Sequence, residues 1–337
     1  MPVRMKDIAR DLGVSQMTVS KALRNHSDIS EKTRERVLKR MRELNYQPDW
    51  IARSMVTKRT YLVGLVLPDL MHSFFAEVAG GVTRKLQPLG YQVVISNTEE
   101  NAETERTHVA NLINRKVDGF IIASAQRSGQ EEPFQLLDKS EIPYVLIDRL
   151  IPGVDATYVG VKDEDLGELA TGHLIGLGCK RIAHIRGPNV STGVGRLRGY
   201  RKALTKRKMP IRREYIVSGQ YGDSTGYDAM LQLLKVSPRP DGVFCYNDPV
   251  AAGAIKAALE LGMRVPEDIA IIGAGNVHYS DLLRVPLSTV DQSSTIIGEK
   301  AAELLSERME SKKPLPVERV FIPPRLVLRE SSNRRTA

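Results

Sequence analysis

The sequence predicts an α/β protein in which a small N-terminal helical unit precedes a larger core of doubly wound parallel sheets. Three observations support this fold class. The chain of 337 residues is longer than one typical domain. Its first part carries three amphipathic segments with helical spacing, and the chain from Tyr61 onward alternates short apolar runs with amphipathic stretches. So many strand and helix units exceed one sheet, and we expect two similar lobes.

Composition narrows the class of protein. A hydrophobic content of 42% and a charged content of 26% are typical of a globular chain, and no apolar run approaches the roughly 20 residues that cross a bilayer. Residues 1–13 lack the apolar stretch of a signal peptide, so we expect a cytoplasmic protein without a membrane partner. Cys179 and Cys245 both lie in apolar runs, which predicts free structural thiols.

The positive charge is concentrated at the N-terminus. The formal net charge is +9, and residues 1–60 contribute 14 Lys and Arg against 7 Asp and Glu, a net charge of +7. Such an excess predicts a polyanionic partner for this segment alone. A solvated basic surface is the alternative interpretation.

Apolar spacing predicts three short helices in the N-terminal unit. Gly13 ends the first helix, and Ser15 can cap the second, which runs to about Asn25. Ser30 can cap the third helix. The apolar positions of the first and third helices that we expect in a shared core are Met5, Ile8, Ala9, Leu12, Val37, Leu38, Met41 and Leu44. Three helices of this size can close around one apolar centre.

The first two helices and the tight turn between them predict a helix-turn-helix, whose second helix lies in the major groove of DNA. Lys21 can donate to guanine, Gln16 can pair with adenine, and Met17 can contact a thymine methyl group. The residues that we expect to read bases are Gln16, Met17, Ser20 and Lys21. Those that we expect at phosphates are Ser15, Thr18 and Asn25. A plain three-helix bundle with a solvated face is the alternative.

The segment YQPDWIARSMVTKRT, residues 46–60, follows the third helix, and Pro48 interrupts the helical pattern. Residues 49–57 can form a helix that is too short to be stable alone, so we expect it to order against DNA or against the same segment of a second subunit. The pattern from MKDIARDLGVSQMTVSKALRN through NYQPDWIARSM resembles the lactose/galactose repressor family of bacterial transcription regulators. The resemblance runs essentially from end to end of the chain.

The resemblance implies specific roles for the N-terminal unit. Gln16, Met17 and Lys21 match positions that read bases, and the short helix after them enters the minor groove. There a symmetry-related pair of side chains opens a central base step. The minor-groove residues expected here are Ala52, Arg53 and Met55, the last at a position where the family usually has leucine. Two such units on a two-fold axis read a pseudo-palindromic operator, which implies a homodimer.

The resemblance also implies two Rossmann-like lobes of the periplasmic-binding-protein type with a small ligand between them. The expected segments are a helix-turn-helix headpiece at 1–47, a hinge helix and linker at 48–60, a core at 61–331 and a basic tail at 332–337. Within the core, the expected first lobe comprises about 61–159 and 291–318, and the second about 160–290 and 319–331. The tail lacks a heptad pattern, so no tetramerising helix is expected.

Ligands of such folds bind at the C-terminal ends of strands, where this sequence places polar and aromatic residues. These residues are Asp69, Ser73, Phe74, Ser124, Asp148, Arg149, Asn189, Arg196, Tyr221, Asn247 and Asp248. Their mixture of acceptors, guanidinium donors and an aromatic ring predicts a sugar or purine-like polar ligand. Arg196, Asn247 and Asp248 match effector-binding positions of the family, and Gln292 matches a cleft residue.

One departure from the family pattern affects this site. Where the family typically reads glycine, an aromatic residue and aspartate, the chain has GAGN at residues 273–276. Gly275 occupies the aspartate position, so the site lacks a carboxylate that bonds the effector. We therefore expect an effector other than a familiar sugar, a negatively charged effector, or none.

The sequence thus predicts a sequence-specific DNA-binding regulator, a repressor whose operator affinity depends on a small polar effector such as a sugar or related metabolite. The six histidines are scattered, and no cofactor or metal site is predicted.

Two alternatives remain: a solute-binding protein that does not bind DNA, and a hydrolase. The sequence GDSTG at 222–226 fits the hydrolase motif G-x-S-x-G, and His278 with Asp248 or Asp268 could complete a catalytic triad. Asp223 and Ser224 of this motif are also ordinary helix-capping residues.

Overall fold

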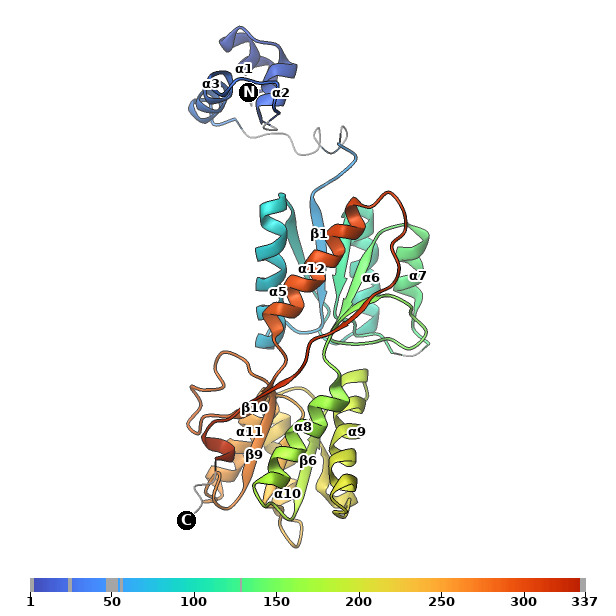
Figure 1. The fold of residues 1–337 in the computed structure, drawn as a ribbon, viewed down its shortest axis with the longest axis vertical. Helices are drawn as coiled ribbons and strands as arrows, with labels where there is room; N and C mark the ends of the chain where they lie inside the picture. Colours follow the sequence, from blue (N-terminus) through green and yellow to red (C-terminus); the bar gives the residue numbers. More distant parts are fainter. Residues whose placement is uncertain (1–2, 24–25, 47–53, 55–56, 128, 334–337) are drawn as a thin grey trace. The chain divides into compact units, whose positions relative to one another are not determined.

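A computed structural model describes residues 3–23, 26–46, 54, 57–127 and 129–333 (Figure 1). The chain divides into two compact units, Met1–Thr60 and Tyr61–Ala337, which we call the N-terminal unit and the core. Among the described residues, no helix is both long enough and apolar enough to cross a membrane.

In residues 3–23 and 26–46 of the N-terminal unit, three helices surround a small apolar centre. They are α1 (Met5–Leu12), α2 (Gln16–Leu23) and α3 (Glu31–Glu43). Gly13 ends α1 with a φ of 63°, a left-handed conformation that suits glycine, and Ser30 caps α3 by accepting a hydrogen bond from the Thr33 amide. The predicted end of the second helix near Asn25 lies outside the described residues.

One residue of the predicted apolar centre is not in it. Leu38 is 38% exposed, whereas Val37 and Met41 are buried against Ile8 and Val19. Val37 and Met41 are four positions apart on α3 and therefore share its inner face, and Leu38 lies on the neighbouring face. The prediction that Leu38 belongs to the core is wrong for this reason.

The first lobe of the core is built on a six-stranded parallel sheet in the order β11-β5-β4-β3-β1-β2. The strands are β1 (Leu62–Leu67), β2 (Gln92–Asn97), β3 (Gly119–Ile122), β4 (Tyr144–Ile147), β5 (Thr157–Gly160) and β11 (Arg319–Phe321). The helices are α5 (Ser73–Leu86), α6 (Ala102–Asn114), α7 (Glu132–Lys139) and α12 (Ser294–Glu310). Helices α5 and α12 pack together, as do α6 and α7 (Figure 1). The inner strands are buried on both faces, as the apolar runs predict.

The second lobe repeats this arrangement with the strand order β12-β10-β9-β8-β6-β7. Its strands are β6 (Ile182–Arg186), β7 (Ile216–Ser218), β8 (Gly242–Cys245), β9 (Ala270–Gly275), β10 (Ser288–Asp291) and β12 (Arg325–Val327), and only β12 is antiparallel to its neighbour. Its helices are α8 (Asp163–Gly176), α9 (Ser191–Lys206), α10 (Asp223–Leu234) and α11 (Asp248–Glu260). Both cysteines are buried and free.

The chain crosses between the lobes after β5, after β10 and after β11 (Figure 1). The predicted boundary at residue 318 is wrong, because β11 pairs with β5 and therefore belongs to the first sheet. The third crossing lies between Phe321 and Arg325. These crossings bring the C-terminal ends of strands from both sheets to one region between the lobes.

Candidate DNA-reading helix and effector cleft

Helix α2 has one buried face and one accessible face. Val19 and Ala22 are buried, whereas Gln16 is exposed and Met17 is 61% exposed. Ser20 and Lys21 are half-buried. The four side chains predicted to read bases thus keep accessible surface while Val19 and Ala22 seat the helix in the core.

The start of α2 is ordered by two hydroxyl groups that were predicted at DNA phosphates. The Thr18 amide donates to Ser15 Oγ over 3.0 Å, and the two hydroxyl oxygens lie 2.9 Å apart. Ser15 thus caps the start of α2, and the start of a helix is a common place for a phosphate to bind. The other predicted contacts, Asn25, Ala52, Arg53 and Met55, lie outside the described residues.

Lys21 has a partner that sequence reasoning missed. Its ammonium nitrogen lies 2.5 Å from Asp28 Oδ2, and His26 Nδ1 contacts the other oxygen of the same carboxylate. Asp28 precedes α3, so the carboxylate holds a predicted base-reading side chain against the turn between α2 and α3. Asp28 lies outside both α2 and α3, so no helix-face pattern pairs it with Lys21, and sequence reasoning had no signal for this contact.

The core contains a small cavity between its two lobes. Its volume is about 20 Å³, which is close to the space that one water molecule needs. It is lined by His72, Phe74, Phe75, Asp148, Arg149, Arg196, Tyr221, Tyr246, Asn247 and Gln292. We call this cavity the cleft. Seven of these ten residues were expected at an effector site, and His72, Phe75 and Tyr246 were not.

Arg149 brings a buried positive charge to the cleft from the first lobe. Its terminal nitrogens donate to both carboxylate oxygens of Glu100, at 2.7 and 2.6 Å, and one of them also donates to the Ser124 carbonyl oxygen at 3.2 Å. The guanidinium carbon lies 5.4 Å from the centre of the Tyr221 ring. Arg149 Nε is 3.6 Å from the Asp148 carboxylate and is without a hydrogen bond among the described residues.

Arg196 brings a second buried guanidinium from α9. Its Nε donates to Asp163 at 2.9 Å, one terminal nitrogen donates to the Tyr246 carbonyl oxygen at 2.7 Å, and the other donates to Gln292 Oε1 at 2.9 Å. The guanidinium also lies 4.7 Å from the centre of the Tyr246 ring. These bonds fix the guanidinium plane, so Arg196 is pre-oriented before any ligand binds.

Burial dominates the electrostatics of the cleft. It raises the pKa of Asp148, and it raises the pKa of Asp163 to about 6 although Arg196 opposes that shift. Burial also lowers the pKa of His72 to about 4, helped by the positive charges of Arg196 and Arg149. The neutral His72 ring lies across the lobe boundary from Asn247, with 3.1 Å between His72 Nε2 and Asn247 Nδ2.

Besides Asp248 and Gly275, four of the predicted effector residues do not line the cleft. Ser124 donates to the buried Glu105 carboxylate at 2.6 Å, and Asp69 accepts from the Met71 amide at 2.8 Å. Ser73 is the first residue of α5, and Asn189 lies in a separate groove on the outer side of α9. Each lies near a strand end, but none is among the residues that line the cleft.

Asp248, which was also predicted at the effector site, does not line the cleft either. This carboxylate is fully buried and accepts hydrogen bonds from Thr289 Oγ1 at 2.5 Å, Ser280 Oγ at 2.8 Å and the Val277 amide at 3.0 Å. Gly275 lies beside it with a φ of 142°, and an added Cβ would be 3.3 Å from an Asp248 oxygen. Asp248 therefore organises the loop after β9, and an aspartate at position 275 would be strained and close to a like charge.

Two parts of the chain match models of known protein families. Residues 4–49 match the model of bacterial regulatory proteins of the lacI family, and residues 171–332 match a periplasmic binding protein-like domain. The ribose operon repressor of Halalkalibacterium halodurans is 34% identical over 97% of this chain and 96% of its own length. This chain belongs to the lacI family of bacterial regulatory proteins.

Solved structures of other lacI-family proteins have the same architecture. A Lac repressor dimer bound to operator and the anti-inducer ONPF shares 27% identity and a TM-score of 0.86, over 98% of this chain and 99% of that one. A CelR–cellobiose complex shares 30% identity and a TM-score of 0.74, with the same coverage. This lacI-family protein is accordingly a sequence-specific DNA-binding regulator of transcription.

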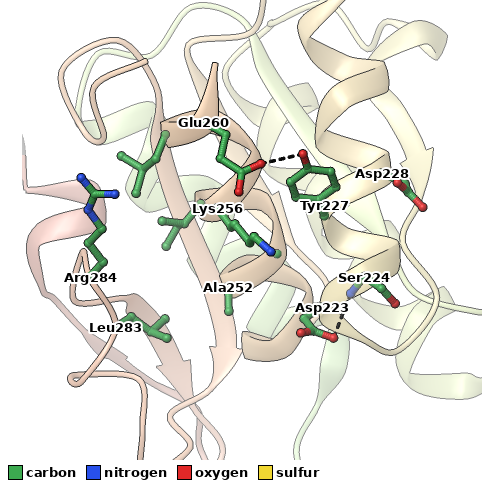
Figure 2. A pocket seen from close by; sticks show the side chains of 12 residues that line it. Asp223, Ser224, Tyr227, Asp228, Ala252, Lys256, Glu260, Leu283 and Arg284 are labelled. Atoms are coloured by element: carbon green, nitrogen blue, oxygen red, sulfur yellow. Dashed lines mark hydrogen bonds between the residues drawn. The ribbon is translucent and has the colours of Figure 1, made fainter. Parts of the chain in front are cut away.

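The hydrolase-like motif of this lacI-family protein lies elsewhere in the second lobe. Figure 2 shows Ser224 beside Asp223 in a pocket of about 690 Å³ between α10 and α11, with Tyr227, Lys256 and Glu260 further along it. The Ser224 amide donates to Asp223 Oδ1 at 2.9 Å, as at a helix start. No histidine is among the described residues that line this pocket.

Proposed function

We propose that the chain is a homodimeric repressor that binds a pseudo-palindromic operator and responds to a small polar effector in the cleft. The headpiece carries one short reading helix, and a single reading helix binds DNA weakly, so a two-fold pair supplies the affinity and selectivity. The printed description of the Lac repressor structure, a dimer bound to operator, supports the same arrangement.

The accessible face of α2 is the observation that supports DNA reading. We propose that Gln16, Met17, Ser20 and Lys21 contact base edges, while Ser15, Thr18 and Asn25 contact phosphates. Met55, with Ala52 and Arg53 beside it, is proposed to enter the minor groove at the centre of the operator.

The effector is proposed to be a polar ring compound that carries a negative charge, such as a sugar acid. A guanidinium offers five N–H donors, and the hydrogen bonds of Arg149 and of Arg196 use three each. The remaining donors of two buried cations suit an anionic acceptor. Gly275 leaves its position without the carboxylate of the family pattern, so Asp148 is the one carboxylate among the described residues that line the cleft, and the Tyr221 and Phe74 rings offer stacking surfaces.

The small volume of the cleft implies a mechanism. A cavity of about 20 Å³ is too small for a sugar-sized molecule, so the lobes must separate for the effector to enter. An effector that fits a more open arrangement shifts the population of lobe arrangements, and it changes operator affinity only by its differential affinity for them.

A screen by thermal shift with sugar acids, neutral sugars and purines tests the effector assignment. We expect the sugar acids to raise the melting temperature and to change operator affinity. Tyr221→Ala should remove the response, and Tyr227→Ala, an equal truncation on α10 outside the cleft, should keep it. If no class of compound shifts the melting temperature, or if Tyr227→Ala abolishes the response as well, the cleft is not the effector site.

We also propose that the chain is not an enzyme. Ser224 is a helix-start residue without a neighbouring histidine among the described pocket residues, and the relatives are transcriptional regulators. Purified protein should not hydrolyse activated esters faster than the Ser224→Ala variant does. Turnover that disappears in Ser224→Ala would contradict this proposal.

A further inference from the structure

A basic groove lies on the second lobe, outside the cleft. It has a volume of about 320 Å³ and is lined by Arg186, Pro188, Asn189, Gly193, Val194, Leu197, Arg198 and Arg201. Three of these eight residues are arginines, and no aspartate or glutamate is among the described residues that line it. The groove therefore concentrates positive charge in a concave surface, whereas the core as a whole is nearly neutral.

The three guanidinium groups are poorly neutralised. Within the described residues, the hydrogen bond of the Arg186 side chain, at the end of β6, is one to the Gly187 carbonyl oxygen at 3.5 Å. Arg198 lies 3.6 Å from Glu164, and that carboxylate is held more closely by Lys202 at 2.8 Å. Arg201 makes no side-chain hydrogen bond or ion pair within the described parts of the chain.

The surroundings of the buried residue His184 show that Arg186 and Arg201 lie near each other. His184 on β6 is fully buried, stacked between the rings of Phe244 and Tyr200 at 4.6 and 5.2 Å. Burial lowers the pKa of His184 to about 3, and the positive charges of Arg196, Arg186 and Arg201 add to the lowering. His184 and Arg186 are two positions apart on β6 and therefore share one face of the sheet, and Tyr200 of α9 packs on His184 from that side, so Arg186 of the strand and Arg201 of α9 line the same groove.

The other lining residues complete a site for a small organic anion. Pro188, Val194 and Leu197 offer apolar surface, and Asn189 offers an exposed amide. Guanidinium groups match phosphate oxygens in geometry and in charge, and they lose little hydration on binding them. The volume lies at the lower end of the range of about 300–1,000 Å³ that is typical of small-molecule pockets.

We propose that this groove binds the phosphate group of a small phosphorylated metabolite, at a second site distinct from the cleft. The bond is noncovalent, formed by charge-assisted hydrogen bonds from Arg186, Arg198 and Arg201. A short concave groove fits a compact anion, whereas a DNA backbone needs an extended surface. The proposal does not depend on operator binding or on the effector in the cleft.

Isothermal titration of the full chain with pyrophosphate at low ionic strength tests this site. Arg201→Gln and Arg186→Gln should each weaken pyrophosphate binding at least tenfold. Arg207→Gln makes the same change of charge at the end of α9, outside the groove, and should alter binding less than twofold. Arg201 and Arg207 are both exposed, so neither variant should disturb folding, and circular dichroism checks this.

Three results would overturn the proposal. The first is that the wild-type chain fails to bind pyrophosphate. The second is that Arg207→Gln weakens binding as much as Arg201→Gln does, which would indicate an effect of bulk surface charge. The third is that Arg201→Gln lowers the affinity for a non-operator duplex and leaves pyrophosphate binding unchanged, which would make the groove a DNA contact. Operator affinity and the response to sugar acids are measured separately, so failure of this site leaves the proposed function intact.

Discussion

Lys21 is a side chain with two competing partners. Asp28 holds its ammonium group at 2.5 Å in the protein alone, and a base edge or a phosphate can take the place of that carboxylate on DNA. The carboxylate also repels phosphates near the reading helix. If Lys21 reads a base as proposed, Asp28 should limit the non-specific attraction of Lys21 for DNA and favour sites where guanine replaces the ion pair.

Replacing Asp28 by Asn should raise affinity for non-operator DNA and reduce discrimination. The freed ammonium can then bind a phosphate, so the slope of log affinity against log salt should steepen by about one. Fluorescence anisotropy with operator and scrambled duplexes over a salt series measures both quantities. Glu43→Gln, an equal change of charge beside Arg40, is the control, and an identical effect of the two variants would show that only net charge matters.

Removal of the Lys21 side chain should lower the affinity for DNA, whereas the Asp28 variant should raise it. Lys21→Ala is expected to cost about 1–3 kcal/mol of operator binding and to relax preference at one operator position. Binding selection from a randomised operator library measures that preference. Lys32→Ala, on the exposed surface of α3, should lower affinity uniformly if at all, and an unchanged base preference in Lys21→Ala would mean that the reading face is wrongly assigned.

At the scale of elements, paired helices approach closely at glycines. An added Cβ at Gly81 on α5 would lie 2.3 Å from the Thr295 carbonyl oxygen on α12, and one at Gly298 on α12 would lie 2.2 Å from the Val78 carbonyl oxygen. Only glycine at both positions lets the backbones come this close. The pair α5 and α12 forms one face of the first lobe (Figure 1), so this contact fixes the helix layer against the sheet.

Gly81→Ala should therefore destabilise the core by about 1–3 kcal/mol through overpacking. The neighbouring Gly80 on the same helix has open space around an added Cβ, so Gly80→Ala should stabilise by about 0.4–1 kcal/mol through a lower unfolded-state entropy. Chemical denaturation of both variants measures the difference. Equal stabilities would show that α5 and α12 can separate without cost.

Strong apolar runs allowed the sequence to predict most of the inner strands, because a strand that is buried on both faces has few polar positions. The edge strands β11 and β12 have no such apolar run, since each has three residues and an exposed or half-exposed pattern. Short elements are stabilised by neighbours that are distant in sequence, and local patterns do not report them.

The cleft was only partly predictable for the same physical reason. Arg196 and Gln292 were identified, and the polar side chains of Asp248 and Ser124 looked equally suitable. Their partners, such as Thr289 for Asp248, lie far along the chain and satisfy them away from the cleft. Tyr246 was missed because an aromatic residue at the end of a buried strand is typical of an ordinary core.

At the scale of the whole core, direct hydrogen bonds hold the two lobes together. Ser191 Oγ accepts from the Leu150 amide at 3.0 Å, and the Glu77 carboxylate accepts from the His278 amide at 3.0 Å. His72 faces Asn247 across the cleft. Because the pKa of His72 is about 4, against 6.5 in an open chain, the folded protein takes up this proton less readily than the unfolded chain does.

The stabilising effect of neutral His72 should therefore be complete above pH 6.5 and fall as the pH decreases towards 4. Asp163 acts in the opposite direction, since its pKa is raised to about 6, so the comparison must be made between variants. Relative to His72→Gln, the wild-type free energy of unfolding should drop by about 1 kcal/mol or more over this interval. His278→Gln, which alters an exposed ring, is the control, and parallel pH profiles for wild type and His72→Gln would contradict the assignment.

The segment from Arg319 to Val327 adds an edge strand to each sheet in turn, β11 beside β5 and then β12 beside β10. Without it, both β5 and β10 would offer unpaired backbone groups to other chains. The ribosome must therefore synthesise this segment before either sheet is complete. Until then the nascent chain exposes two unpaired strand edges, at β5 and at β10. Production of this regulator should accordingly be sensitive to any event that halts translation shortly before Arg319.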